Sequence, residues 1–166
     1  MPYTPNYAAG DVLTAAAMNS IGEAWTSYGS TASFTAATVN PTLGSGGTWT
    51  AYYSQVNKVV RVRGRIAWGS TGRALGTGNY YIALPVTARS DQPTVGSAVG
   101  QCFYFDVGGL VYTGMVTVDS TSRCALWWVG DTGIDVINLN QTASTQYPHT
   151  VGSGDLIDFT FTYEAA

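Results

Sequence analysis

The sequence predicts a mainly β fold, an antiparallel β-sandwich of the jelly-roll type, with a short α-helix near the N-terminus. Three observations support this prediction. From Ser33 onward, apolar and polar residues alternate with a period of two in eight or nine short runs, which is typical of strands with one buried face. The runs are separated by segments rich in Gly, Asn, Asp and Ser, which favour hairpins. No helical pattern lies between them, so we expect the strands to pair with one another.

The segment from Thr14 to Gly29 has a helical pattern. Thr14 is a suitable N-cap, three alanines follow it, and Gly29 can end the helix. A helix of about four turns is marginal alone, so it must dock, either on the chain's own β domain or on a neighbouring subunit or particle. We therefore divide the chain into an N-terminal anchoring arm and helix, residues 1–32, and a β-sandwich domain, residues 33–166. The predicted anchoring face carries Met18, Ile21, Trp25 and Tyr28.

The predicted strands are nine in number, and two of them alternate regularly enough to assign faces. We expect a core face with Val60, Val62, Gly64, Ile66 and Trp68 in one, and with Ile157, Phe159, Phe161 and Tyr163 in the other. In chain order the predicted strands are Phe34–Val39, Thr48–Val56, Val59–Trp68, Tyr80–Leu84, Ala98–Val107, Leu110–Val118, Arg123–Val129, Ile134–Leu139 and Leu156–Tyr163.

The opposite face of the strand Val59–Trp68 carries an arginine ladder, Arg61, Arg63 and Arg65. One interpretation is a solvated sheet face whose arginines pair with acids on a neighbouring strand, such as Asp158 and Glu164. The other is a strip that binds anions or a partner, where Arg–carboxylate pairs would fix the register with a neighbouring subunit.

Three pairs of adjacent aromatic residues also stand out: Tyr52-Tyr53, Tyr80-Tyr81 and Trp127-Trp128. Successive strand residues point to opposite faces, so one ring of each pair is expected to point away from the core. Exposed aromatic rings favour a subunit interface, or a carbohydrate surface on which sugar rings stack, and ordinary core packing is the third possibility. The predicted glycan or partner surface comprises Tyr52, Tyr53, Trp127, Trp128 and, from the flexible loop predicted at Gly69–Gly78, Arg73.

The composition limits the classes of function. The chain has 166 residues, the size of one domain, and only 10% of them are charged. A net charge of −3 gives no reason to expect nucleic acid as a partner, and no apolar run is long enough for membrane insertion. Residues 1–10 lack the features of a secretory signal, so we expect synthesis in a reducing cytoplasm. There, Cys102 and Cys124 are expected to be buried thiols rather than a disulfide.

We do not expect an enzyme, a cofactor or a metal site. The single histidine, His149, follows a proline in a predicted loop, and no Gly-x-Ser-x-Gly motif accompanies it. Several of the ten acids lie in turn-like settings, where Asp stabilises the backbone. Neither cysteine has a second Cys or His at the spacing that zinc requires.

Two stretches resemble tailed-bacteriophage virion proteins. Residues 7–22, which read YAAGDVLTAAAMNSIG, resemble the N-terminal segment of many such proteins, in which a Gly-Asp/Glu-x-Leu/Val-Thr-Ala-Ala run leads into a short helix. The stretch from Tyr52 to Pro85, which contains VNKVVRVRGRI and GNYYIALP, is similar to the β domain of phage minor tail and fibre-like proteins. Together the two stretches cover 50 of the 166 residues.

The resemblance implies a structural protein of the virion surface, made in the bacterial host cytoplasm and attached by its N-terminal segment with the β domain outward. Its implied partners are itself, as a homotrimer, and other virion proteins of the tail or capsid. We expect no fibre shaft in this chain, so a capsid decoration protein stays open beside a minor tail or fibre-like knob. A glycan-binding module that recognises a host receptor is a further alternative.

Overall fold

The computed structural model describes residues 24–29, 33–91, 97–129, 136–137 and 151–166. These residues form a mainly β, antiparallel fold, which confirms the predicted fold class. The strands are β1 (Thr26–Ser27), β2 (Phe34–Ala36), β3 (Thr48–Val56), β4 (Val59–Ala67), β5 (Tyr80–Ala83), β6 (Ala98–Phe105), β7 (Val111–Ser120), β8 (Arg123–Val129), β9 (Val136–Ile137) and β10 (Leu156–Glu164).

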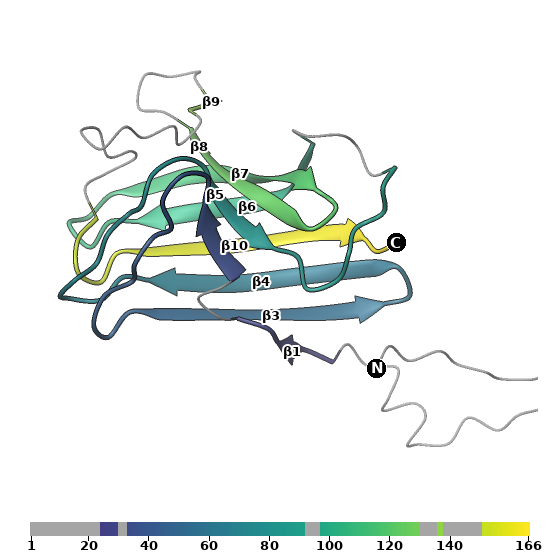
Figure 1. Cartoon of the computed structure of the whole chain (residues 1–166), viewed down its shortest axis with the longest axis horizontal. Coiled ribbons are helices and arrows are strands. Elements are labelled where there is room, and N and C mark those ends of the chain that lie inside the picture. The colour runs from purple at the N-terminus through teal and green to yellow at the C-terminus, as the bar shows by residue number, and fades with distance from the viewer. Residues whose placement is uncertain (1–23, 30–32, 92–96, 130–135, 138–150) are drawn as a thin grey trace, which may run out of the picture.

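The strands belong to one sheet in the order β1-β3-β4-β10-β6-β7-β8-β5-β2, and β9 pairs with β8 beside this path. Figure 1 shows the sheet curling, so that β5 and β2 lie across the long strands β4 and β10. Phe34 of β2 therefore stacks on Trp49 of β3 with ring centroids 6.0 Å apart, although the two strands lie near opposite ends of the order. The layers of the sandwich are two parts of one curled sheet.

The strand boundaries follow the sequence pattern closely. The predicted strands Thr48–Val56 and Arg123–Val129 are confirmed at both ends. The first predicted strand, Phe34–Val39, ends early at Ala36, whose amide donates a hydrogen bond to the Asn40 side chain. Of the predicted strand at 134–139, β9 contains two residues, and the others lie outside the described residues.

The two assigned core faces are confirmed. Val60, Val62, Ile66 and Trp68 of the β4 region are at most 2% exposed, while the arginines between them are exposed. On β10, the four predicted core side chains are at most 4% exposed. Four large aromatic residues meet inside the sandwich, with ring centroids 6.1 to 6.5 Å apart: Trp68, Tyr80, Tyr104 and Trp128.

One row of registered residues crosses the inner face of the sheet and contains a glycine that a large ring covers. Across the inner face, Gly64 of β4 lies opposite Phe159 of β10, which lies opposite Cys102 of β6 and then Gly114 of β7. A Cβ atom placed on Gly64 would lie 2.3 Å from Cζ of Phe159. The missing side chain thus leaves the space that the Phe159 ring fills, stacked on Trp49 at 5.5 Å.

The predicted helix lies outside the described residues except for its last turn, and there the prediction is wrong. Thr26 and Ser27 form β1 and pair with Tyr53 and Tyr52 of β3, so Trp25 and Tyr28 do not share a helical face. The amide of Tyr28 continues the pairing by donating to the Ala51 carbonyl at 2.9 Å. The exposed edge of β3 offers backbone partners, and this tertiary pairing outweighs a modest local helix propensity.

Both cysteines are free and buried, as predicted. Cys102 lies on β6 and Cys124 on β8, with β7 between them. Burial raises the pKa of each thiol to about 12, so both are held as neutral, unreactive thiols. Within the described part of the chain, no helix is long and apolar enough to cross a membrane.

Candidate functional site

The outer face of β3, β4, β10 and β6 holds the candidate site, because the strand register aligns its side chains in two rows. The first row is Tyr52, Arg63, Thr160 and Gln101, and the second is Thr50, Arg65, Asp158 and Phe103. Between them lies an open hollow of about 560 Å³, which we name the outer groove. It is lined by Thr50, Tyr52, Arg63, Gly64, Phe103, Phe105, Asp158, Phe159 and Thr160.

One wall of the outer groove is aromatic. Phe103 and Phe105 alternate on β6 with the buried Cys102 and Tyr104, so their half-buried rings lie on the outer face. Their centroids are 6.2 Å apart. Strand β10 lies between this wall and β4 and forms the floor of the groove. Its residue Thr160 lines the groove and has a short side chain, which fills little of the space. The hollow follows from this sequence of large, small and large side chains.

The other wall is built around Arg63. Its guanidinium lies over the Trp25 ring, 4.2 Å from the centroid, and 5.8 Å from the centroid of the Tyr52 ring. Arg63 is exposed, and within the described part of the chain it makes no ion pair, unlike Arg65, Arg89 and Arg123. The wall therefore presents a positive charge held in place by aromatic rings.

Arg65 is neutralised within the sheet. Its Nε and Nη2 atoms donate to the two carboxylate oxygens of Asp158, each at 2.6 Å, and this pair further raises the pKa of Arg65. The cross-strand partner predicted for the arginine ladder is thus correct for Asp158. Glu164, the other predicted partner, lies opposite Val59 and forms an ion pair with Arg89.

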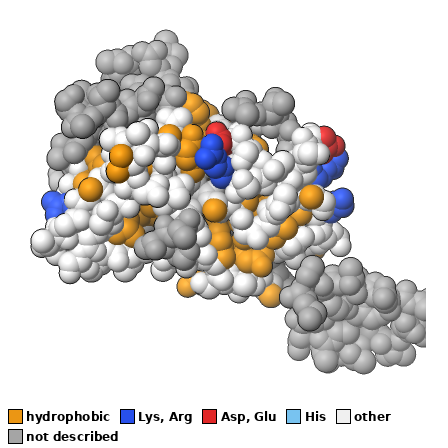
Figure 2. All heavy atoms as spheres, viewed as in Figure 1, with side chains coloured by type: hydrophobic (Ala, Val, Ile, Leu, Met, Phe, Trp, Pro, Cys, Tyr) orange, Lys and Arg blue, Asp and Glu red, His pale blue; other side chains and the backbone are white. Residues whose placement is uncertain are grey.

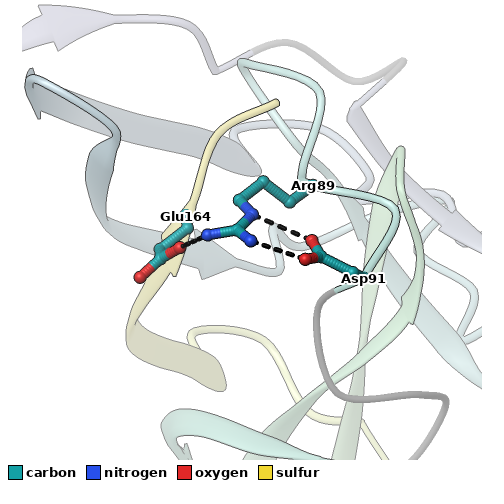
Figure 3. A network of polar contacts seen from close by, with 3 residues as sticks. All are labelled: Arg89, Asp91 and Glu164. Atoms are coloured by element: carbon teal, nitrogen blue, oxygen red, sulfur yellow. Dashed lines mark hydrogen bonds and ion pairs between the residues drawn. The ribbon is translucent and has the colours of Figure 1, made fainter.

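Figure 3 shows how Glu164 is engaged: the Arg89 guanidinium bridges Glu164 and Asp91. The Arg89 Nη1–Glu164 distance is 2.5 Å, and the hydrogen bond from Arg89 is the main cause that lowers the pKa of Asp91. Arg89 also donates its backbone amide to the Glu164 carbonyl. This network fastens the end of β10 to the segment after β5, which is a structural task.

The predicted aromatic surface is not assembled as expected. Tyr52 is exposed, but Trp128 is fully buried and Tyr53 packs edge-on against Tyr28 at 5.8 Å. Trp127 is half-buried, and its Nε1 atom donates to Thr117 at 2.6 Å. Tyr81 points away from the core cluster as alternation requires, yet it is only 8% exposed because Arg123 covers its ring at 3.9 Å. Trp128 and Tyr53 are therefore removed from the candidate surface.

Arg73 also has a structural position. Its Nε atom donates to the Val151 carbonyl at 3.1 Å, and Nη1 donates to the Ser70 carbonyl. The loop around it was predicted to be flexible, but its backbone pairs with the segment at 42–45: Ala74 exchanges two hydrogen bonds with Thr42. Arg73 therefore holds this loop and does not extend from it toward a target.

The outer groove holds few groups that could act in catalysis. Among its lining residues, Asp158 is the one carboxylate, and both of its oxygens accept hydrogen bonds from Arg65. Within the described ranges no group of three or more His, Cys, Asp or Glu residues is placed to hold a metal ion. The groove offers aromatic faces, hydroxyl groups and the positive charge of Arg63.

Sequence reasoning missed the aromatic wall and the low floor. The signal for Phe103 and Phe105 was present in the sequence. The alternation in the run Ala98–Val107 places both side chains on the face of the strand opposite to that of Cys102. Their meeting with Arg63 depends on β10 inserting between β4 and β6, which no local pattern indicates. Of the anchoring residues, Met18 and Ile21 lie outside the described residues.

The rest of the visible surface carries little charge. Figure 2 shows one face of the molecule, on which charged side chains form a few small groups and hydrophobic side chains emerge between uncharged atoms. Comparison with models of known protein families, with curated proteins and with solved structures gives no match.

Proposed function

We propose that the chain is a non-enzymatic structural protein on the surface of a bacteriophage particle, a minor tail or fibre-like knob that forms a homotrimer. In this proposal the N-terminal segment attaches the protein to other virion proteins, and the β domain faces outward. A capsid decoration protein is the variant in which the same attachment is made to the head.

The observation that carries the proposal is the way in which the N-terminal segment joins the sheet. Residues 7–22, which carry the resemblance to phage virion proteins, lead into Trp25 and Tyr28. Trp25 contacts Arg63 of β4, and Tyr28 packs against Tyr53 of β3. β1 pairs with only Tyr52 and Tyr53 of the nine residues of β3. An arm held at one edge of a low-charge domain suits attachment to a larger assembly.

The test is the mass of the purified protein by light scattering. We expect three times 17.5 kDa for the full chain and a monomer for a shortened chain that begins at Ala24. This shortened chain keeps β1, Trp25 and Tyr28, so a change of mass reports on residues 1–23 rather than on damage to the sheet. A monomeric full chain would contradict the trimer. Failure of the protein to bind to phage particles that lack it would contradict the virion role.

A second candidate, a glycan-binding module for a host receptor, is supported by the outer groove. Its volume lies in the range of small-molecule sites, roughly 300–1,000 Å³. Its lining combines aromatic rings with hydroxyl and charged groups. A glycan array screened with the full chain tests this candidate, and binding to no glycan on the array would contradict it.

A further inference from the structure

We propose that the outer groove binds an acidic saccharide, with the sugar's carboxylate on Arg63 and its apolar ring face against Phe103 and Phe105. This inference rests on the second proposed function, glycan recognition, and names its site and the class of its ligand. It is independent of whether the protein belongs to a virion.

The first step is the charge of the groove. The negative charge of Asp158, which lines the groove, is neutralised because both of its oxygens accept hydrogen bonds from Arg65 at 2.6 Å. Arg63 has no such partner among the described residues, and it lines the groove. The guanidinium lies over the Trp25 ring at 4.2 Å, so its charge is held in place before a ligand arrives. A fixed cation in an open groove favours an anionic ligand, and a guanidinium matches a carboxylate in two-point geometry.

The second step concerns the shape of the ligand. The rings of Phe103 and Phe105 form an apolar wall, with centroids 6.2 Å apart, and between them and Arg63 lie the Asp158 carboxylate and the Thr160 hydroxyl. A ligand that fits must have apolar C–H faces and many hydroxyl groups close together. A saccharide has both on every ring.

The third step separates a saccharide from a peptide. The groove lies on the face of the sheet, where the backbone groups of β4 and β10 are already paired on both sides. An extended peptide would therefore find no strand edge to pair with, and its backbone would lose hydrogen bonds to water without replacement. An amphipathic helix would need a continuous apolar surface, but the charged side chains of Arg63 and Asp158 line the groove. Hydroxyl groups can use these same side chains as donors and acceptors.

The experiment is calorimetric titration of the full chain with two matched pairs of probes: trigalacturonate with its methyl ester, and sialyllactose with lactose. The first pair differs only in the carboxylate, and the second differs in the whole sialic acid residue that carries it. We expect at least one acidic probe to bind about tenfold or more tightly than its neutral counterpart, because the ester or the missing acid leaves Arg63 without a partner.

Arg63→Gln and Arg61→Gln form the matched variants. Both arginines are exposed on β4, but only Arg63 lines the groove. We expect Arg63→Gln to weaken acidic-probe binding about tenfold or more and Arg61→Gln to leave it within about twofold. Arg63→Lys keeps the positive charge but loses the planar guanidinium. We expect its affinity for the acidic probes to lie between those of the two glutamine variants. Thermal melting of each variant verifies that it folds.

Each contrary result has a distinct meaning. Equal losses in the two glutamine variants, or equal binding of pentaglutamate, would overturn the proposed site or its ligand class. If neutral probes bind as well as acidic ones and Arg63→Gln changes nothing, glycan recognition stands and this inference fails. If none of the four saccharides binds, the acidic-saccharide site fails, while the glycan array decides the wider function.

Discussion

The Tyr104 hydroxyl donates a hydrogen bond of 2.8 Å to the carboxylate of Asp155, which is fully buried. The same carboxylate accepts hydrogen bonds from the amides of Val107 at 3.0 Å and Gly152 at 2.6 Å. Asp155 therefore ties the turn after β6 to the segment that leads into β10, at the end of the core where Tyr104 meets Trp68 and Trp128.

Replacing Asp155 by Ala should lower the free energy of unfolding by about 2–5 kcal/mol, because three donors would be left without their buried acceptor. Urea unfolding followed by fluorescence measures this. Tyr104→Phe removes one of the hydrogen bonds and is expected to cost less, about 1–2 kcal/mol. Equal losses in the two variants would show that the amide contacts contribute nothing.

Gly64→Ala should destabilise the fold by about 1–3 kcal/mol, since the new Cβ atom would lie 2.3 Å from Cζ of Phe159. Chemical denaturation gives the value. The double variant with Phe159→Leu should lose less stability than the sum of the two single variants, because the smaller side chain relieves the overlap. Strict additivity would contradict the proposed role of the Gly64–Phe159 contact.

Trp25→Ala should loosen the segment that contains β1, because the ring no longer stacks on Arg63. The expected loss of stability is small, about 0.5–1 kcal/mol for an exposed cation–π contact. Limited proteolysis offers a more sensitive measurement, with faster cleavage between residues 24 and 33 than in the unaltered chain. Val111→Ala, an exposed substitution on β7, is the control and should leave that cleavage rate unchanged.

Cys102 and Cys124 should not react with a thiol reagent at pH 8 in the folded protein, and both should react in denaturant. Burial raises the pKa of each to about 12 from 9.0, so the folded state holds their protons more tightly. Their contribution to stability is therefore present below about pH 9 and is lost as the pH rises through about 12. Reaction of either thiol without unfolding would contradict the buried positions.

Alkaline unfolding should be steep, because burial also raises the pKa of Tyr28, Tyr80, Tyr104 and Tyr163 above 10.0. Each of these phenols keeps its proton in the folded state and loses it on unfolding, so stability falls as the pH rises above about 10. Absorbance at the tyrosinate band, recorded with circular dichroism, should show these tyrosines ionising only as the sheet is lost.

Much of the fold could be predicted because alternation is a local signal. The run Val59–Trp68 revealed both its buried face and its arginine ladder without knowledge of its neighbours. The pairing of Asp158 with Arg65 could be anticipated because both lie on outer faces of regular strands. The strand at Thr26–Ser27, in place of the last turn of the predicted helix, could not, because it depends on the exposed edge of β3.

The site was predicted less well than the fold, for a physical reason. Alternation assigns Trp128 and Tyr81 to a face of their strand but does not say what covers that face. Trp128 points into the space enclosed by the curled sheet, and Tyr81 lies beneath Arg123. Exposure is a property of the complete sheet, so counting aromatic residues overestimated the surface available for partners.

The central position of β10 has a consequence for how the protein is made. The β3–β4 hairpin and the β6–β7–β8 meander are both local in sequence, yet β10 joins them by pairing with β4 on one side and β6 on the other. The two halves cannot close into one sheet until residues 156–164 have been made and have paired with both. Before β10 inserts, the edges of β4 and β6 that it covers lie open, and open strand edges favour pairing with other chains.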